Sequence, residues 1–492
     1  MPMLRYVLPL LALLLSLPAM ADEPSAKAPD KDADSKLLAL LPADSVTEHK
    51  GVFAGRTVAY TATAGTLPLR DGNGVRTGLA FYVAYTEKGA PAGSRPITFC
   101  FNGGPGAGSA FLHLGVAGPQ ALEFPANEID GAGAKLKDNP DSWLAVTDLV
   151  FIDAMGTGWS RPVKAEDAPR QFWGVRQDAA TFARIVALWI ARNGRNASPK
   201  YLAGESYGGF RAVALAGALQ AEENTLVDGL ILVSPLLDWS FGNTDINPLA
   251  DATHLPSLAA AELERHHRFT PAAVEEAWHW ALGDYLTTLA GPPLDGDAAK
   301  TFYAKIGGLI GVAPDIVART GGWINPFAHD IRLHDGLYTS IYEGSIGVPD
   351  PFPNGDRGGV DPLLDGYGRA YGNAFVGYAT DKLHFKTDLP YELLAGDVGE
   401  KWDWRGESGL AIGVTDDLRR LLALNPSLKV FIAHGYFDLI TPFSTSRWIA
   451  EHMPIGRQRI TLRVYPGGHM MYTRPASRAA LSRDVRQLIA GK

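Results

Sequence analysis

The sequence predicts an α/β protein with a mostly parallel central sheet and helices on both of its faces. Short apolar runs without polar alternation are typical of strands covered on both faces, and apolar residues at helical spacing lie between them. Alternation of such strands and helices favours a parallel sheet. The apolar runs are residues 97–101, 149–153, 201–203, 230–234 and 430–433, and the clearest helical segment is 175–192.

The composition is that of a globular protein with a buried core. Of 492 residues, 46% are hydrophobic and 20% are charged, and the net charge is −8. This profile excludes collagen-like, largely disordered and disulfide-stapled classes. The charge is not gathered in runs, so we expect no nucleic-acid partner. The lone Cys100 cannot form an intramolecular disulfide, so stability should come from packing.

The N-terminus has the pattern of a secretory signal peptide at residues 1–21. Arg5 supplies the positive charge, residues 7–17 form an apolar run, and Ala19-Met20-Ala21 is a small-x-small cleavage site. The run is too short to span a bilayer of about 30 Å, so we expect no stable membrane insertion after cleavage. An uncleaved anchor is the alternative. We expect export to the periplasm, followed by a flexible leader at 22–46, which is poor in large apolar residues.

The folded part opens with a predicted hairpin. Residues 56–64 and 77–86 have strand character, and Asp71-Gly72-Asn73-Gly74 between them is a strong turn signal. The alternating pattern then occupies 47–242 and 396–492, which we assign to one α/β domain. Residues 243–395 interrupt it with helix-like segments at 257–267 and 271–289 and Gly- and Pro-rich stretches. This interval is predicted to be a largely helical insertion that covers the sheet as a lid.

The strongest chemical signal is a serine between a strand and a helix. A nucleophile on a tight strand-to-helix turn needs small neighbours, because the turn brings the backbone close to the next helix. Ser206 has this setting, after the strand-like 201–203 and before the helix-like 211–220. A plain turn serine is the alternative. The motif is Gly204-Glu205-Ser206-Tyr207-Gly208-Gly209.

A nucleophilic serine needs a base, and the base needs an orienting carboxylate. In sheets of this kind the chain order is Ser, then Asp or Glu, then His. Asp438 follows the strand-like 430–433, and His469 follows the strand-like 460–464 in a Gly-rich loop. A loop histidine bonded to backbone is the alternative for His469. The nearest competitor, His434, lies at a strand end and suits a buried structural role better.

A glycine cluster at 101–109 follows the strand-like 97–101. Its backbone N–H groups could approach an anion and complete an oxyanion hole with the amide after Ser206. A dinucleotide-binding loop is the alternative. Pro105 and the lack of an acidic ribose partner argue against it.

Together these motifs resemble the serine carboxypeptidase family, peptidase family S10, within the α/β-hydrolase fold. The resemblance extends over roughly 95–480 and implies Ser206 as nucleophile, His469 as base and acid, and Asp438 as its orienter. It implies a peptide or protein C-terminus as substrate and neither metal nor cofactor. It further implies oxyanion donors at Gly104 and Tyr207 and a substrate-carboxylate site at Asn102, Gly103 and Glu205. The matching segments are Asn102-Gly103-Gly104-Pro105-Gly106, Asp153, Gly156-Thr157-Gly158-Trp159-Ser160, the Ser206 motif, Asp438, Gly468-His469-Met470 and Pro475.

A glutamate beside the nucleophile repels a substrate carboxylate unless one of the two is protonated, so binding through Glu205 should favour acidic pH. The alternative for Glu205 is an acid that stabilises the helix start. The chain departs from the family pattern at Ala107, where the family usually has a cysteine, and at Val116, where it often has an acid that shares a proton with this glutamate. The departure at Val116 leaves an esterase or acyltransferase as the alternative function. A catalytically silent binding protein is a third reading.

Overall fold

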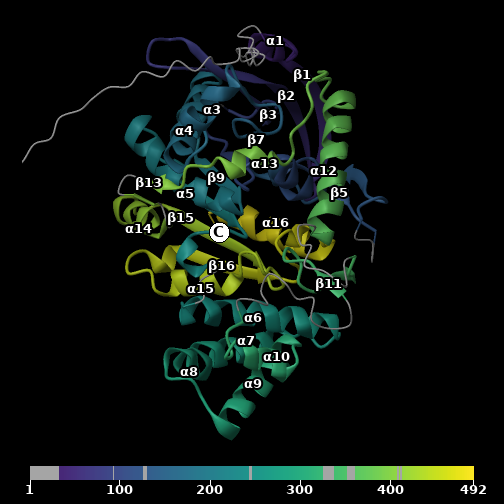
Figure 1. Cartoon of the computed structure of the whole chain (residues 1–492). Coiled ribbons are helices and arrows are strands. Elements are labelled where there is room, and N and C mark those ends of the chain that lie inside the picture. The colour runs from purple at the N-terminus through teal and green to yellow at the C-terminus, as the bar shows by residue number, and fades with distance from the viewer. Residues whose placement is uncertain are drawn as a thin grey trace, which may run out of the picture.

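The computed structural model describes residues 33–91, 93–125, 130–242, 246–324, 337–351, 361–406, 409–410 and 413–491. The predicted signal peptide at 1–21 lies outside this range. The predicted α/β class is confirmed: a ten-stranded sheet runs through the molecule with helices on both faces (Figure 1).

Nine strands form the main path of the sheet in the order β1-β2-β3-β7-β4-β9-β10-β15-β16, and β8 pairs with β3. From β7 to β16 neighbouring strands are parallel, whereas β1, β2, β3 and β7 pair antiparallel. The strands are β1 (Ser45–Phe53), β2 (Arg56–Arg70), β3 (Arg76–Glu87), β4 (Ile97–Phe101), β7 (Asp148–Ile152), β8 (Arg161–Pro162), β9 (Lys200–Glu205), β10 (Gly229–Val233), β15 (Lys429–Gly435) and β16 (Ile460–Tyr465). Two-stranded pairs are formed by β5 (Gln120–Glu123) with β6 (Lys135–Asp138), β11 (Leu337–Thr339) with β12 (Gly347–Pro349), and β13 (Arg405–Gly406) with β14 (Gly409–Leu410).

The N-terminal hairpin is longer than the sequence pattern predicts. Strands β2 and β3 pair from Tyr60 with Glu87 to Arg70 with Arg76, around the predicted turn. Strand β1, which the sequence analysis did not predict, pairs with β2 along its whole length. The sequence predicts a flexible leader at 22–46. Helix α1 (Ala33–Ala39) and the first residues of β1 fall within that segment.

Two hydrophobic cores lie on opposite faces of the sheet. One contains Phe182 of α4 and Leu215 of α5, and the other contains Tyr371 of α12 and Leu481 of α16. The helices of the α/β domain and its flanks are α2 (Ala110–Leu112), α3 (Ala168–Gln171), α4 (Val175–Arg192), α5 (Tyr207–Glu222), α12 (Pro362–Asp381), α13 (Gly396–Glu400), α14 (Thr415–Leu424), α15 (Phe443–Glu451) and α16 (Pro475–Ala490).

The central strands contribute side chains to both cores, which explains their unbroken apolar runs. In β10, Leu230 and Leu232 pack into the core with α4 and α5, while Ile231 and Val233 pack into the core with α12 and α16. Successive side chains of a strand point to opposite faces, so a strand with no solvent-exposed face needs an apolar residue at every position.

The interval 243–395 does not pack as one body. Helices α6 to α10 form their own small hydrophobic cluster and gather at the lower end of Figure 1, whereas α12 lies against the main sheet. Two tryptophans of α7 are held in different ways: Trp280 packs on Tyr285 in the small cluster, and Trp278 is buried beneath Arg447. The helices are α6 (Pro248–Arg265), α7 (Pro271–Trp280), α8 (Leu286–Ala290), α9 (Gly296–Ile310) and α10 (Pro314–Arg319).

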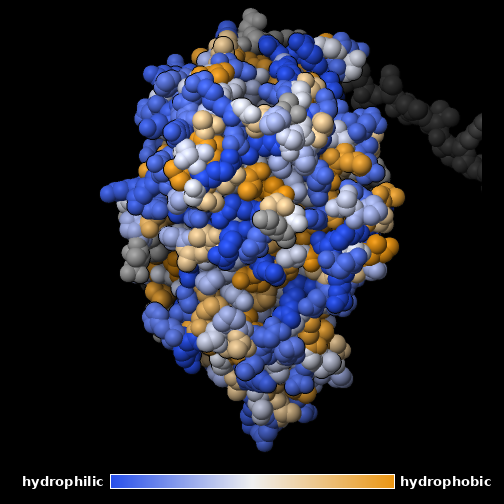
Figure 2. Space-filling view, turned by 180° about the vertical axis from the view of Figure 1, so that it is seen from behind, coloured by the Kyte–Doolittle hydropathy of each residue, from blue (hydrophilic) through white to orange (hydrophobic). Residues whose placement is uncertain are grey.

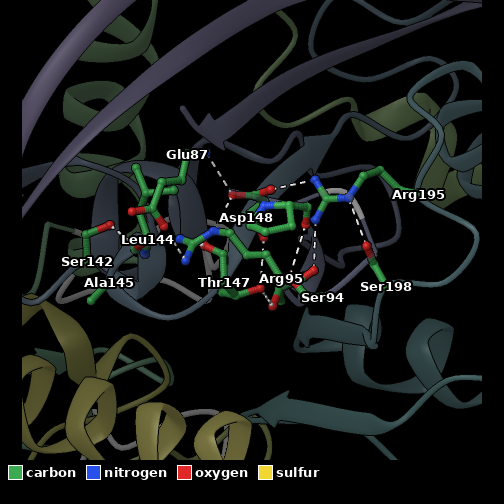
Figure 3. Close-up of polar contacts among 12 residues, drawn as sticks. Glu87, Ser94, Arg95, Ser142, Leu144, Ala145, Thr147, Asp148, Arg195 and Ser198 are labelled. Carbon is green, nitrogen blue, oxygen red and sulfur yellow. Dashed lines mark hydrogen bonds and ion pairs between the residues drawn. The ribbon is translucent and has the colours of Figure 1, made fainter. Parts of the chain in front are cut away.

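A buried ion cluster closes the amino end of the parallel strands. Asp148, the first residue of β7, lies between the guanidinium groups of Arg95 and Arg195, with N–O distances of 2.6 Å to each (Figure 3). Arg95 also pairs with Glu87 at 2.6 Å, and Arg195 bonds the carbonyl of Arg95. Each buried charge thus has an opposite charge and further hydrogen bonds, as buried ions require.

The surface seen in Figure 2 is mainly hydrophilic, with hydrophobic residues scattered among hydrophilic ones. Within the described ranges, none of the helices combines the length and apolarity needed to cross a membrane.

Candidate active site

The predicted site residues gather at the carboxyl ends of neighbouring parallel strands. Ser206 follows β9, Asp438 follows β15 and His469 lies in the loop after β16. The Gly-rich loop follows β4, which is the neighbour of β9. In open α/β sheets this edge is where ligands bind, because loops from several strands converge there.

Ser206 lies on a strained turn between β9 and α5. Its backbone angles are φ 60° and ψ −127°, in a region that side chains rarely adopt. The neighbouring glycines make the turn possible, since a Cβ on Gly204 would lie 1.9 Å from the Gly208 carbonyl oxygen. A Cβ on Gly209 would lie 2.4 Å from Pro235. The turn holds Ser206 only partly exposed at the sheet edge.

His469 and Asp438 are in direct contact. The imidazole Nδ1 lies 2.9 Å from Asp438 Oδ2, and both side chains are buried. Asp438 Oδ1 accepts the backbone N–H groups of Ile440 and Thr441 at 3.0 and 2.9 Å, and the Thr441 hydroxyl lies 2.7 Å from Oδ2. Burial alone would lower the pKa of His469, but the charge and hydrogen bond of Asp438 raise it above its ordinary value.

Ser206 and His469 are hydrogen-bonded to two adjacent residues at the end of β10, Val233 and Ser234 respectively. Ser206 N–H donates to the Val233 carbonyl at 3.0 Å, and the Ser234 hydroxyl donates to the His469 carbonyl at 2.8 Å. No hydrogen bond between the Ser206 hydroxyl and the imidazole is found among the described residues. Such bonds are often long in the unliganded form and tighten when substrate binds.

The loop that carries His469 is held by a segment from the interval 243–395. His469 N–H donates to the Tyr342 carbonyl at 2.6 Å, and Gly468 N–H donates to Glu343 Oε2 at 2.5 Å. The ring of Tyr342 lies edge-on to the imidazole, with 5.3 Å between ring centroids. Arg474 pairs with Glu343 at 3.2 Å and with Glu264 of α6 at 2.9 Å. The predicted base is therefore positioned by residues more than 100 positions earlier in the chain.

The Gly-rich loop lies directly against the Ser206 turn. A Cβ on Gly103 would lie 2.5 Å from the Tyr207 amide nitrogen and 2.6 Å from the Glu205 carbonyl. Gly104 has a φ of 95°, which favours glycine. The N–H groups of Gly104 and Tyr207, the predicted oxyanion donors, make no hydrogen bond to another described residue. Arg211 of α5 pairs with Asp178 at 2.6 Å and donates to the Asn102 carbonyl, which fixes the start of this loop.

Glu205 is buried next to the nucleophile position. Its carboxyl accepts from Asn102 Nδ2 at 2.7 Å and lies 2.8 and 2.9 Å from the hydroxyl of Tyr472. Burial raises the pKa of Glu205 to about 7, although the charge of His469 and the bonds from Tyr472 and Asn102 act in the opposite direction.

The Asp153 motif lies beside the Gly-rich loop and hydrogen-bonds to it. Its carboxylate accepts the N–H and hydroxyl of Ser109 at 2.7 and 2.8 Å and the N–H of Trp159 at 3.2 Å. A Cβ on Gly158 would lie 1.7 Å from Asp153 Oδ2, which explains a glycine there. The motif ties the Gly-rich loop after β4 to the loop after β7.

A cavity of about 510 Å³ opens beside the Asp438 loop. Leu236 N–H donates to the Ser206 carbonyl at 3.2 Å, so this wall is bonded to the backbone of the nucleophile position. Other wall residues are Leu237, Trp239, Phe241 and Pro442, which make the cavity largely apolar.

Sequence reasoning missed several residues that hold the site together. Thr441 and Tyr472 each lie three residues after a predicted site residue, Asp438 and His469, and that closeness was the available signal. The contact of Tyr342 and Glu343 with the His469 loop had no local signal. His434, set aside as structural, is buried, and its Nε2 lies 2.8 Å from the Ser446 hydroxyl.

Comparisons with known proteins agree with this architecture. Residues 61–258 match the model of the serine carboxypeptidase family. Serine carboxypeptidase-like 44 of Arabidopsis thaliana is 29% identical over 154 residues, covering 30% of this chain and 29% of that protein. Serine carboxypeptidase-like 36 of the same plant is 22% identical over 408 residues, covering 80% of this chain and 72% of that protein. The first alignment thus spans under a third of the relative's length, and the second spans most of it.

A solved structure shares the fold over nearly the whole chain. A prohormone-processing carboxypeptidase from Saccharomyces cerevisiae superposes with a TM-score of 0.55 at 16% identity, covering 88% of this chain and 91% of that one. At this identity the likeness is evidence for the fold alone. The chain therefore has the α/β-hydrolase fold, and its residues 61–258 are similar to the serine carboxypeptidase family.

Proposed function

We propose that this protein is an exported serine carboxypeptidase that hydrolyses the C-terminal bond of peptides. The observation that carries the proposal is the buried Glu205 carboxyl, held by Asn102 directly beside Ser206. A carboxyl group in that place limits how far a bound chain can extend past the nucleophile, because it pairs with a terminal carboxylate. The signal-peptide pattern at 1–21 supports export, and the periplasm is the proposed destination.

In the proposed reaction the Ser206 hydroxyl attacks the carbonyl carbon of the last peptide bond. His469 takes the hydroxyl proton on Nε2, and Asp438 accepts the hydrogen bond from Nδ1. The N–H groups of Gly104 and Tyr207 stabilise the oxyanion. When the tetrahedral intermediate collapses, the C–N bond breaks and His469 returns the proton to the leaving amine. Water then attacks the acyl-enzyme by the same steps and releases the shortened peptide.

We assign different surroundings to the terminal carboxylate of the substrate and to one of its side chains. Asn102, the Gly103 amide and a protonated Glu205 form the proposed site for the terminal carboxylate. The apolar cavity beside Leu237 and Trp239 offers room for an apolar side chain of the substrate.

A direct test incubates the mature protein with a peptide library and identifies the products by mass spectrometry. Stepwise loss of C-terminal residues is expected, and a fluorophosphonate should form an adduct on Ser206. Ser206→Ala should lose both, with kcat lower by about 10⁶-fold. Ester turnover with intact peptides would favour the esterase or acyltransferase alternative, and a wild-type protein without an adduct would leave only a binding role.

A further inference from the structure

Tyr472 is a partner of Glu205 that neither the sequence motifs nor the family match assigns. It belongs to η7 (Met471–Thr473), a short helix just after the His469 loop. Its hydroxyl oxygen lies 2.9 Å from Oε1 and 2.8 Å from Oε2 of Glu205, while Asn102 Nδ2 donates to Oε2. Among the described residues, no second carboxyl group hydrogen-bonds Glu205.

The fold makes room for this tyrosine with a glycine. Tyr472 is fully buried, and a Cβ on Gly115 would lie 2.3 Å from its ring atom Cε2. Gly115 immediately precedes Val116, the position where the family resemblance leads us to expect an acid. The aromatic ring therefore packs against the residue that precedes the position of the missing acid.

We propose that Tyr472 is a positioning residue for the substrate-carboxylate site, and that its hydroxyl and the Asn102 amide together hold Glu205 where a peptide's terminal carboxylate binds. This inference rests on the proposed function. In this arrangement Glu205 has two neutral hydrogen-bond partners in place of a second acid. The charge of the substrate-carboxylate site then depends on the Glu205 carboxyl.

The neighbours of Glu205 decide how its proton responds to pH. His469 and Asp438 face it from the loops after β16 and β15, and Tyr342 lies on the segment that packs against His469. The buried Tyr371 of α12 faces Glu205, whose charge raises the pKa of this tyrosine. The positive charge of Arg478, on α16, lowers the pKa of Tyr371.

Burial raises the pKa of Tyr472 well above its ordinary value, so it remains a neutral donor. A donor bond favours the ionised form of Glu205, and its removal should make Glu205 keep its proton to higher pH.

The test compares Tyr472→Phe with Tyr371→Phe. The first change removes a hydroxyl bonded to Glu205 and keeps the ring against Gly115. The second removes a buried hydroxyl from the same region that has no hydrogen-bond partner in the described part of the chain. For each variant, kcat/KM is measured from pH 5 to 9 on a peptide with a free C-terminus and on the same peptide as a C-terminal ester.

With Tyr472→Phe, the decline of kcat/KM on the free peptide should move to higher pH by on the order of one pH unit, while the ester profile stays in place. Tyr371→Phe should move neither profile. The inference is wrong if Tyr472→Phe keeps the wild-type profile, or if both substrates shift equally, which would indicate a merely structural role.

A second measurement separates this inference from the proposed function. Infrared difference spectra follow protonation of the Glu205 carboxyl directly, with Glu205→Gln identifying its band. The band should titrate at higher pH in Tyr472→Phe than in the wild type, whether or not the protein cleaves peptides. An unchanged titration overturns the role of Tyr472. A shifted titration in a protein that releases no C-terminal residue overturns the proposed function alone.

Discussion

Ionisation of Glu205 is expected to weaken both substrate binding and the stability of the fold. Burial raises its pKa to about 7, compared with an ordinary value of 4.5. The folded protein therefore holds a proton on Glu205 at pH values where the unfolded chain has lost it. Since stability falls with pH wherever the folded state binds more protons, the cost of ionising buried Glu205 develops from about pH 4.5 to pH 7.

We expect Glu205→Gln to stabilise the fold at alkaline pH relative to the wild type. The gain should be absent at pH 4 and reach on the order of 3 kcal/mol above pH 8, because glutamine has no charge to bury. Urea unfolding at pH 4 and 8 measures it. The same change should remove the part of the alkaline decline of kcat/KM on free peptides that comes from ionisation of Glu205, while the dependence on His469 remains. An equal effect on stability at both pH values would contradict the raised pKa.

The two glycines at 204 and 217 differ in the space around them. A Cβ on Gly204 would lie 1.9 Å from backbone, whereas a Cβ on Gly217, inside α5, would meet nothing within 4 Å. Gly204→Ala should therefore disrupt the turn and abolish fluorophosphonate labelling. Gly217→Ala should label normally and raise the free energy of unfolding by up to about 1 kcal/mol, because alanine favours a helix. Normal labelling of Gly204→Ala would argue against the strained turn.

At the scale of elements, the segment around β11 and β12 supports the loop after β16. Asp361, the residue before α12, accepts the N–H of Ile341 at 2.9 Å and the hydroxyl of Ser340 at 2.8 Å. That segment then bonds the backbone of Gly468 and His469. The interval 243–395 thus acts on the site by fixing the backbone of the proposed base.

Glu343→Ala should lower activity much more than Glu264→Ala. Both residues pair with Arg474, but only Glu343 also accepts the Gly468 N–H. Loss of Glu343 frees the His469 loop, and a displacement of about 1 Å is expected to reduce kcat by about 10²-fold. Glu264→Ala should keep kcat and cost about 1 kcal/mol or less of stability. Steady-state kinetics with thermal unfolding tests both, and equal kcat losses would contradict the positioning role.

At the scale of the whole molecule, stability and chemistry lie at opposite ends of the parallel strands. The loops after β4, β9, β15 and β16 carry the candidate site, and the cluster of Asp148, Arg95 and Arg195 closes the other end (Figure 3). A defect in that cluster should act on unfolding without moving the site.

Asp148→Ala should cost about 3–5 kcal/mol, because it leaves the buried Arg195 without a carboxylate and Arg95 with Glu87 alone. Asp167→Ala is the control, since it removes an exposed pair with Arg170 and should cost under about 0.5 kcal/mol. Urea unfolding measures both. At temperatures where Asp148→Ala remains folded, kcat/KM should match the wild type, and a selective loss of activity would contradict the separation of the two ends.

Local pattern was sufficient for the central elements of the α/β domain. Strand β4 and helix α4 have the bounds that the sequence predicts, because residues covered on two faces or along one stripe must be apolar at fixed spacing. The edge strand β1 escaped prediction. Its burial alternates between exposed and half-buried positions, so it carries little apolar signal.

The sequence by itself determined the class of fold and the motifs that follow each strand, since turn chemistry depends on neighbouring residues. Tertiary structure decided which distant side chains complete the site. Tyr472 reaches Glu205 across 267 positions, and Glu343 reaches Gly468 across 125. Likewise, α12 packs on the sheet although it lies within the interval predicted as a lid. Such contacts depend on how whole elements pack and not on local spacing, and they leave no short-range pattern in the chain.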